Sequence, residues 1–478
     1  MTSYSRDVRV RQTRAELDRL IETLRDWEQC RRDRDRYSKN EYRGQYQSQV
    51  AAIVGEVRGA AKVIGDLLDT EAAGAMATPL PALFQNCARH DRRIIWLWRA
   101  FNYYREKFDQ RDDARIGPAL RAADEVLWSS MKPFFTGSGI TMPPIPLPFI
   151  NDAYSPIAVR ANEAGHLEKE AAIDSGPLKD FFTRLPVALL QLPPMVVTAP
   201  WAHVLIAHET GHFIQSLIPA PDGYRSVFRD RVKDAVRTAG GSEQDAAVWA
   251  RWSPEIFADL YSVAVMGPWA VWTMAQFEFS QEGRLTTRRD DYPSPLVRIT
   301  LLKNFAEAVG FAQMPRLLDG FGLDLTAEAK ASEQCQSDVV AAHEVARLIL
   351  DPLPGIGKTL PDIVGLRTAD FQPAAGMDVA GVVVRWADSL LGRTVRQAER
   401  NLRAARQVSA ATAQAWKEIT EMPAGIARDG AIQTVTKSAF PCMVACSEPG
   451  TRAAPPPARE AGALTRIVLE MPDDELFG

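Results

Sequence analysis

Apolar residues recur every three or four positions along much of the chain, the spacing that lines one face of an α-helix. Such stripes run through residues 17–27 and 53–68. Two further helical patterns cover residues 92–109 and 112–130, the first of them rich in aromatic residues that can pack against neighbouring helices. We therefore predict a helical N-terminal region over residues 1–150.

Changes in composition predict the boundaries of the other regions. Residues 137–156 are rich in Pro and Gly, which cannot sustain a helix, so a domain change is expected near residue 150. The chain becomes Ala-rich and helical again after residue 361, and residues 448–463 resemble a flexible linker ahead of an acidic tail. The predicted regions after the first are a core over 151–360, a helical C-terminal region over 361–447, and a linker with its tail over 448–478.

Two apolar segments in the core region have different lengths and different expected structures. Residues 261–277 form an uncharged run that is too short to span a bilayer and contains Gly267-Pro268, so we expect two buried segments joined at a break. Residues 185–193 form a shorter run bounded by prolines, which predicts a strand. Placed at the edge of a sheet, this strand could hold an extended peptide by backbone pairing.

Composition narrows the classes of partner and compartment. The 478 residues are 46% hydrophobic and 24% charged, as in a globular protein of two to four structural units. The formal net charge of −4, without a long basic stripe, makes nucleic acid an unexpected partner. A charged N-terminus and five scattered cysteines favour a cytoplasmic protein with reduced thiols. Because the longest uncharged apolar run, residues 261–277, is too short to span a bilayer, no integral membrane segment is expected.

The sequence PWAHVLIAHETGHFIQSLI contains the strongest chemical motif of the chain, with Pro200 placed to begin a helix. His208 and His212 are four residues apart, so on a helix both imidazoles can reach one Zn²⁺. Glu209 follows the first histidine and can act as general base on a water molecule at the metal. His203 lies about 140° round the helix from His208, so a core or rim histidine is expected there.

A catalytic zinc usually has a third protein ligand, and SPEIFAD over residues 253–259 supplies a candidate. We expect Ser253 to cap a second helix and Pro254 to begin it, which would place Glu255 in its first turn. Asp259 would lie one turn later on the same face. Glu255 is thus the predicted third ligand and Asp259 the acceptor that orients a ligand histidine, although an acid favoured by a helix N-terminus is the ordinary alternative for Glu255.

These two motifs resemble the gluzincin arrangement, HExxH followed by ExxxD, which is familiar from thermolysin. HETGH and EIFAD are most similar to the CAAX prenyl protease and HtpX group, whose pattern is HExGH with ExxAD. The resemblance covers about residues 185–310 and does not include the membrane-spanning helices of that group.

Members of the group also carry a His-Pro-Pro segment followed by an arginine. This chain has YPSPLVR over residues 292–298, so Tyr292 replaces the histidine and Arg298 retains the arginine. The resemblance implies that Tyr292 donates a hydrogen bond to the oxyanion and that Arg298 assists. Tyr261, near Glu255, is a second tyrosine to consider for this role, while the alternative for Tyr292 and Arg298 is a purely structural part.

Cys442 and Cys446 have the spacing of one helix face. They could supply a thiolate to an inhibited zinc site or pair with each other, but two buried thiols are the more ordinary expectation.

The sequence as a whole predicts an α+β, mainly α protein with a zincin-like metallopeptidase core between helical N- and C-terminal regions. The expected activity is zinc-dependent hydrolysis of a peptide or protein substrate, with a further protein partner possible at the N-terminal helices. Two alternatives stay open: an inactive helical interaction or scaffold protein that retains a zinc site, and a zinc hydrolase of a non-peptide bond.

Overall fold

The structure, a computed structural model, is mainly helical and contains one small sheet, which confirms the mainly α part of the predicted fold class. The residues that it describes are 2–37, 46–152, 156–159, 187–279, 285–311, 317–322, 324–330, 332–372, 380–448 and 465.

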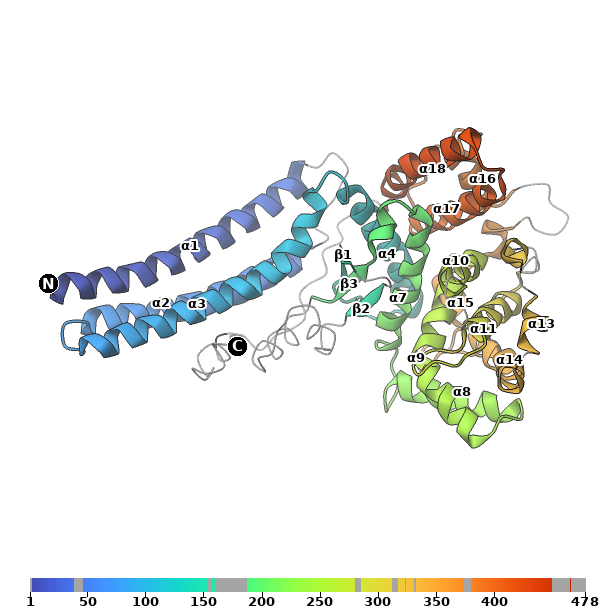
Figure 1. The fold of residues 1–478 in the computed structure, drawn as a ribbon, viewed down its shortest axis with the longest axis horizontal. Helices are drawn as coiled ribbons and strands as arrows, with labels where there is room; N and C mark the ends of the chain where they lie inside the picture. The colour runs from blue at the N-terminus through green and yellow to red at the C-terminus, as the bar shows by residue number, and fades with distance from the viewer. Residues whose placement is uncertain are drawn as a thin grey trace.

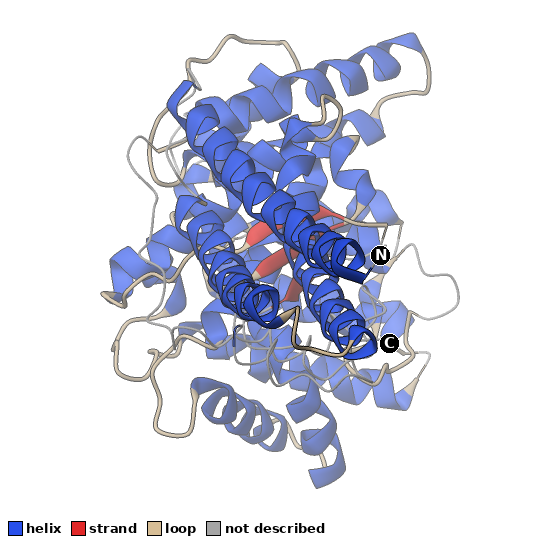
Figure 2. Ribbon diagram, turned by 90° about the vertical axis from the view of Figure 1, so that its left-hand side faces the viewer, coloured by secondary structure: helices blue, strands red, loops and turns tan. Residues whose placement is uncertain are grey.

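Three long helices form an arm that extends away from the rest of the molecule (Figure 1). They are α1 (Thr2–Tyr37), α2 (Gln47–Gly74) and α3 (Leu80–Asp109), each of which packs against the other two. Figure 2 looks along the arm. Leu17 and Leu24 are fully buried in it, so the apolar stripes predicted from the sequence form the contacts between these helices.

A buried carboxylate joins the arm to the rest of the chain. Asp124 lies on α4 (Gly117–Ser138) and accepts hydrogen bonds from the Tyr46 hydroxyl at 2.7 Å and from Arg111 Nη2 at 2.7 Å. The predicted helix within residues 112–130 is therefore present, but α4 packs against α7, α17 and α18 rather than along the arm. The domain boundary near residue 150 stays a prediction.

The sheet has three strands in the described residues, in the order β1-β3-β2. β1 (Leu147–Ile150) pairs in parallel with β3 (Leu189–Leu192), and β2 (Ile157–Val159) pairs with β3 antiparallel. The strand predicted within residues 185–193 is present, but β3 is central and pairs on both sides, so it cannot be the edge strand that was considered for holding an extended peptide. β1 lies in the Pro-rich segment and β2 is only three residues long, so neither gave a strand pattern. β2 contacts α7.

The remaining described elements build a body around this sheet, which Figure 2 shows in red among the helices. Its helices are α7 (Ile206–Gln215), α8 (Tyr224–Thr238), α9 (Glu243–Met266), α10 (Pro268–Glu278), α11 (Pro295–Ala308), α13 (Leu325–Ala329), α14 (Glu333–Ala346), α15 (Leu360–Val364), α16 (Val382–Leu390), α17 (Ala404–Glu421) and α18 (Ile426–Ala445). Short 3₁₀ segments are η1 (Gln110–Asp112), η2 (Pro194–Val197), η3 (Pro200–Leu205), η4 (Asp319–Phe321), η5 (Arg347–Leu350) and η6 (Thr368–Asp370). The helices predicted after residue 361 pack directly on the body, since α17 contacts α4, α9, α10 and η3.

The apolar run over residues 261–277 divides as expected. α9 ends at Met266, Gly267 takes a positive φ of 61°, and α10 begins at Pro268. A Cβ at Gly267 would also lie 2.9 Å from the ring of Phe371, so both backbone conformation and space require glycine. No helix in the described ranges combines the length and apolar character that crossing a bilayer requires. The predicted linker and acidic tail after residue 448 lie almost wholly outside the described residues.

Candidate metal centre

Two helices that pack against each other carry the candidate ligands, and a glycine sets their separation. A Cβ at Gly211 of α7 would lie 2.7 Å from Ala258 Cα and 2.9 Å from Tyr261 Cβ on α9. Real Cβ atoms do not approach so closely, hence only glycine allows this helix contact. The fourth residue of HETGH thus brings the histidines of α7 within reach of α9.

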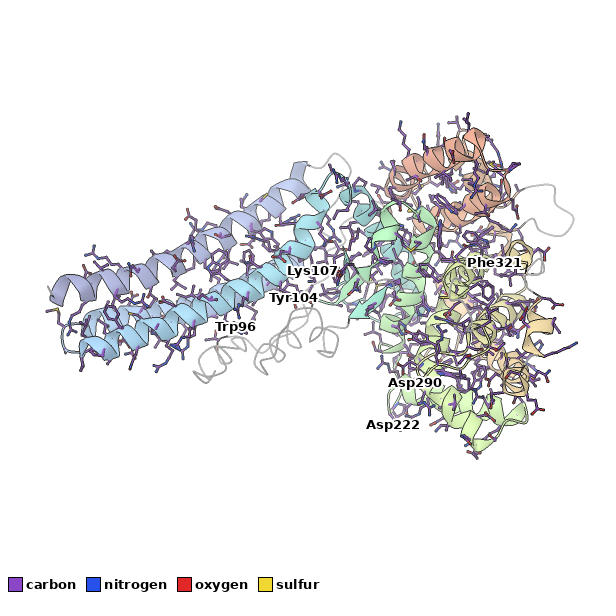
Figure 3. The ribbon with its side chains drawn as sticks, viewed as in Figure 1. Trp96, Tyr104, Lys107, Asp222, Asp290 and Phe321 are labelled. Atoms are coloured by element: carbon purple, nitrogen blue, oxygen red, sulfur yellow. The ribbon has the colours of Figure 1, made fainter. Side chains whose placement is uncertain are left out.

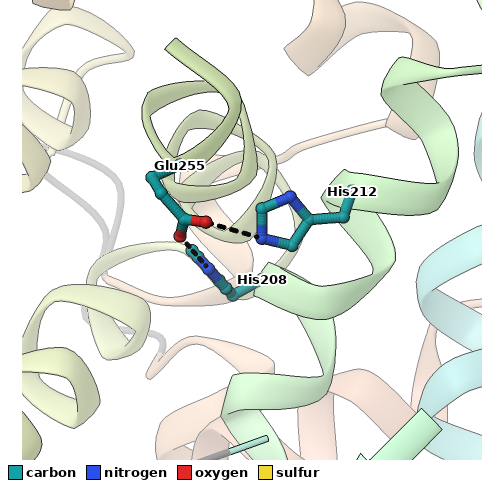
Figure 4. Close-up of side chains that lie close together, drawn as sticks. All are labelled: His208, His212 and Glu255. Carbon is teal, nitrogen blue, oxygen red and sulfur yellow. Dashed lines mark hydrogen bonds and ion pairs between the residues drawn. The ribbon is translucent and has the colours of Figure 1, made fainter. Parts of the chain in front are cut away.

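The three predicted ligands converge on one point (Figure 4). His208 Nε2 lies 3.2 Å from Glu255 Oε2, and His212 Nε2 lies 3.5 Å from Glu255 Oε1. One ligand atom from each residue falls within 4.8 Å of the others. Atoms bound tetrahedrally at about 2.0–2.1 Å from zinc are about 3.3–3.4 Å apart, so this donor set fits Zn²⁺.

The group is largely buried, and His208 is the most buried of its three members. The His208 side chain is 7% exposed, whereas those of His212 and Glu255 are each 15% exposed. Burial by itself would lower the pKa of His208, but Asp259 and Glu255 raise it to about 10. The two histidines hold the pKa of Glu255 well below its usual range despite burial. In the metal-free form the His208 ring is therefore protonated on both nitrogens, and a metal ion must displace one of these protons.

Glu209 is also buried but is separate from the ligand group. Its carboxylate accepts a hydrogen bond from the Ala158 backbone N–H of β2, a contact that the sequence did not predict. Burial raises the pKa of Glu209, and the nearby His208 and His212 oppose that rise. A carboxylate with a raised pKa beside the ligands has the properties of a general base.

Asp259 connects His208 to Arg298. Asp259 Oδ1 lies 2.9 Å from His208 Nδ1, the nitrogen opposite the one that faces Glu255. Arg298 of α11 donates to both Asp259 oxygens at 2.9 Å. Asp259 thus occupies the place of an acceptor that orients a ligand histidine. The Arg298 guanidinium also approaches the ligands, with Nη2 3.8 Å from Glu255 Oε2.

The helix that supplies Glu255 begins earlier than expected. α9 starts at Glu243 and is capped by Ser242, so the prediction that Ser253 caps a helix beginning at Pro254 is wrong. Pro254 cannot donate to the Ala250 carbonyl, but the Ser253 hydroxyl donates to that carbonyl at 2.8 Å and replaces the lost bond. Glu255 therefore lies in mid-helix, where the dipole of a helix N-terminus does not explain a carboxylate.

Tyr292 lies in the turn before α11, near Asp290, which Figure 3 labels. Arg289 and Arg298 place their guanidinium carbons 5.1 and 5.2 Å from the centre of its ring. Burial and the negative charges of Glu255 and Glu209 raise the pKa of the Tyr292 phenol, so it stays protonated and able to donate. Glu255 and Glu209 of the candidate site are thus among the charges that act on this phenol.

Tyr261 and His203, two other residues considered from the sequence, make structural hydrogen bonds. Tyr261 donates its hydroxyl to the Ser130 carbonyl at 2.7 Å, so this hydroxyl points away from the ligands. His203 is fully buried in η3 with Nε2 3.0 Å from the Ala119 carbonyl, and burial lowers its pKa to about 4. It is a core histidine, as expected.

Cys442 and Cys446 lie at the end of α18, and neither forms a disulfide. Burial raises the pKa of both thiols, that of Cys446 to about 12. Neither is therefore a ready thiolate donor at neutral pH.

Sequence reasoning missed two residues that contact the predicted ones. Glu278, the last residue of α10, is 3% exposed and pairs with Arg298, and Arg289 pairs with Glu278 as well as stacking on Tyr292. A signal for Glu278 was present, because it is the single acid in the apolar segment 261–279.

Comparisons of this chain with protein-family models, with curated proteins and with solved structures found no match. The convergence of His208, His212 and Glu255, with Asp259 and Glu209 beside them, is therefore the basis for a function.

Proposed function

We propose that this chain is a zinc-dependent peptidase of the gluzincin type, in which His208, His212 and Glu255 hold the metal. The observation that carries the proposal is the approach of these three side chains from two helices, with ligand atoms within 4.8 Å of one another and both His–Glu separations close to those around tetrahedral zinc. The buried Asp259 beside His208 supports it, since ligand histidines usually donate their second nitrogen to a carboxylate.

Glu209, Tyr292 and Arg298 would each have a separate role in this reaction. Bound zinc would supply a positive charge that polarises the scissile carbonyl and acidifies a water molecule. Glu209 takes the proton from that water and returns it to the leaving amine. Tyr292 donates its hydroxyl to the oxyanion, and Arg298 fixes Asp259 and adds positive charge near Glu255.

The metal is tested first by its stoichiometry. Protein purified without chelator should contain about one zinc per chain, and His212→Ala should lower this strongly because it removes one of three ligands. An exposed histidine on another helix, His343 of α14, provides the matched control, since His343→Ala should retain the zinc. A wild-type chain that neither contains nor takes up zinc refutes the proposal.

The reaction is tested by a search for new peptide termini in cells that express the wild type or Glu209→Gln. Termini that appear only with the wild type support peptide-bond hydrolysis. Zinc binding without any such termini would favour a scaffold protein or a hydrolase of another bond, and assays with ester and amide substrates that lack peptide bonds would separate these two.

A further inference from the structure

Glu278 lies between two arginines in the interior of the body. Its carboxylate receives Arg298 Nη1 at 2.9 Å, and Arg289 Nη2 lies 3.0 Å from each of its oxygens. The Glu278 side chain is 4% exposed and that of Arg298 is 6% exposed. A buried carboxylate is costly unless paired, so its retention at this point needs both cations.

One of the two arginines leads to the proposed metal. Arg298 uses Nη1 for Glu278 and its other donors, Nε and Nη2, for Asp259. Asp259 in turn faces His208 Nδ1. The Arg298 guanidinium is planar and rigid. The pairing of Glu278 with its Nη1 therefore fixes the direction in which Nε and Nη2 point toward Asp259.

The other arginine leads to the turn that carries Tyr292. Arg289 donates through Nε and Nη2 to the Pro293 carbonyl, at 3.1 and 2.9 Å, and stacks on the Tyr292 ring. Its backbone N–H donates to the Tyr292 carbonyl at 3.2 Å, which closes the turn. Arg289 and Arg298 therefore flank one aromatic ring, and without an anion between them their charges would repel each other.

We propose that Glu278 is a positioning residue, which through Arg298 orients His208 and through Arg289 holds the Tyr292 hydroxyl at the oxyanion. This inference rests on the proposed peptidase function. Among the described residues the carboxylate contacts the two arginines and none of the three proposed ligands, so we place its effect in these arginines. Glu278 thereby links metal binding by α7 and α9 to the placement of the Tyr292 hydroxyl, which comes from the turn before α11.

Glu278→Gln tests the whole arrangement, because the amide has the same shape but no negative charge, and its NH2 group in place of Oε2 would face the Arg289 donor. We expect zinc affinity, measured by competition with a chelator, to fall by roughly tenfold, the lower end of the cost of losing an outer partner of a ligand. At saturating zinc, kcat should fall with little change in KM. Glu307→Gln removes one acid from the Lys303–Glu307 pair on the surface of α11 and should leave both quantities unchanged.

Arg289→Lys tests the second branch alone, since lysine keeps the charge but cannot donate twice to Pro293 while stacking on Tyr292. Here kcat should fall while zinc affinity stays at the wild-type value. In combination with Tyr292→Phe, the loss of kcat should be smaller than the product of the two single losses, because both changes act on one donor.

The outcomes separate the inference from the proposed function. A folded Glu278→Gln protein with wild-type zinc affinity overturns the inference, as do multiplicative losses in the cycle of Arg289→Lys with Tyr292→Phe. If Glu278→Gln does not fold, that cycle decides. A wild type that binds zinc but cleaves no peptide refutes the peptidase, and the chelator competition then still decides the link between Glu278 and His208. A wild type that binds no zinc overturns both.

Discussion

The α7–α9 pair and the turn before α11 contribute to the proposed site by different means. On α7 and α9 the functional side chains are four residues apart on regular helices, and Gly211 lets the helices meet. The turn over residues 285–294 has no such regularity. It is tied to α9, α10 and α14 by arginines, and residues far apart in the chain therefore determine where Tyr292 lies.

In the proposed peptidase this difference separates metal binding from the placement of the hydrogen-bond donor. Helix geometry alone puts His208 beside His212, and Glu255 beside Asp259, so the ligand set depends on few other residues. The position of Tyr292 depends on Arg289 and on Glu278, the buried carboxylate that pairs with Arg289. Variants of the helix pair should therefore change the metal or the base, and variants of the turn should change turnover alone.

The largest expected effect is that of Glu209→Gln on the helix pair. Turnover should fall by about 10²–10⁴-fold, because the amide cannot take a proton, while zinc content stays near that of the wild type. His208→Ala is the comparison variant and should lose zinc. If Glu209→Gln loses zinc to the same extent, Glu209 is a ligand and not the base.

Tyr292→Phe should have the next largest effect. The raised pKa keeps the phenol protonated, and loss of one oxyanion donor costs about 10²–10³-fold in rate, so kcat should fall with KM and zinc content unchanged. Tyr224→Phe, in a ring cluster with Phe228 and Phe257, is the control for a merely packed tyrosine. A Tyr292→Phe enzyme with wild-type kcat would remove the turn from the chemistry.

Asp259→Asn should weaken zinc binding by about 10–100-fold, since His208 loses the carboxylate that faces its Nδ1. Chelator competition measures this, and Asp234→Asn on the exposed face of α8 is the matched control. Unchanged affinity would make Asp259 a structural partner of Arg298 alone.

The contrast between the regular helix pair and the irregular turn also explains which parts of the proposed site could be predicted from the sequence. HETGH and EIFAD encode their geometry locally, so the ligands and Asp259 could be named from spacing. The start of α9 could not, because Ser253-Pro254 has the composition of a helix start but lies inside a helix that Ser242 caps, with the Ser253 hydroxyl bonded to the Ala250 carbonyl. The central position of β3 depends on β1, which is contributed by a Pro-rich segment.

Contacts between distant residues were the part that spacing could not supply. Arg298 was expected to assist the oxyanion, and its contacts with Asp259 and Glu278 join residues 39 and 20 positions away. No local pattern encodes such distances. The arm was predicted as helical from its stripes, since each stripe needs only its own helix to be recognised.

The smallest expected effect on kcat is that of a change at Arg288, which anchors the turn to α9 and α14. Arg288 donates to Asp338 of α14 at 2.6 and 2.7 Å and to Asp245 of α9 at 2.7 Å, and its guanidinium carbon lies 5.6 Å from the centre of the Trp252 ring. Arg288→Gln would leave the buried Asp338 with the Trp249 N–H but without a cation. The protein should therefore lose thermal stability.

Because Arg288 touches neither a ligand nor Tyr292, its loss should loosen the turn without altering the zinc site. We expect kcat to fall roughly tenfold or less, since a full 1 Å misplacement costs on the order of 10²-fold, and zinc affinity to stay unchanged. Arg237→Gln provides the control, because Arg237 holds Asp234 and Glu243 at the surface and should affect neither quantity. Weakened zinc binding in Arg288→Gln would mean that the turn and the helix pair are one unit, and the division between metal binding and donor placement would fail.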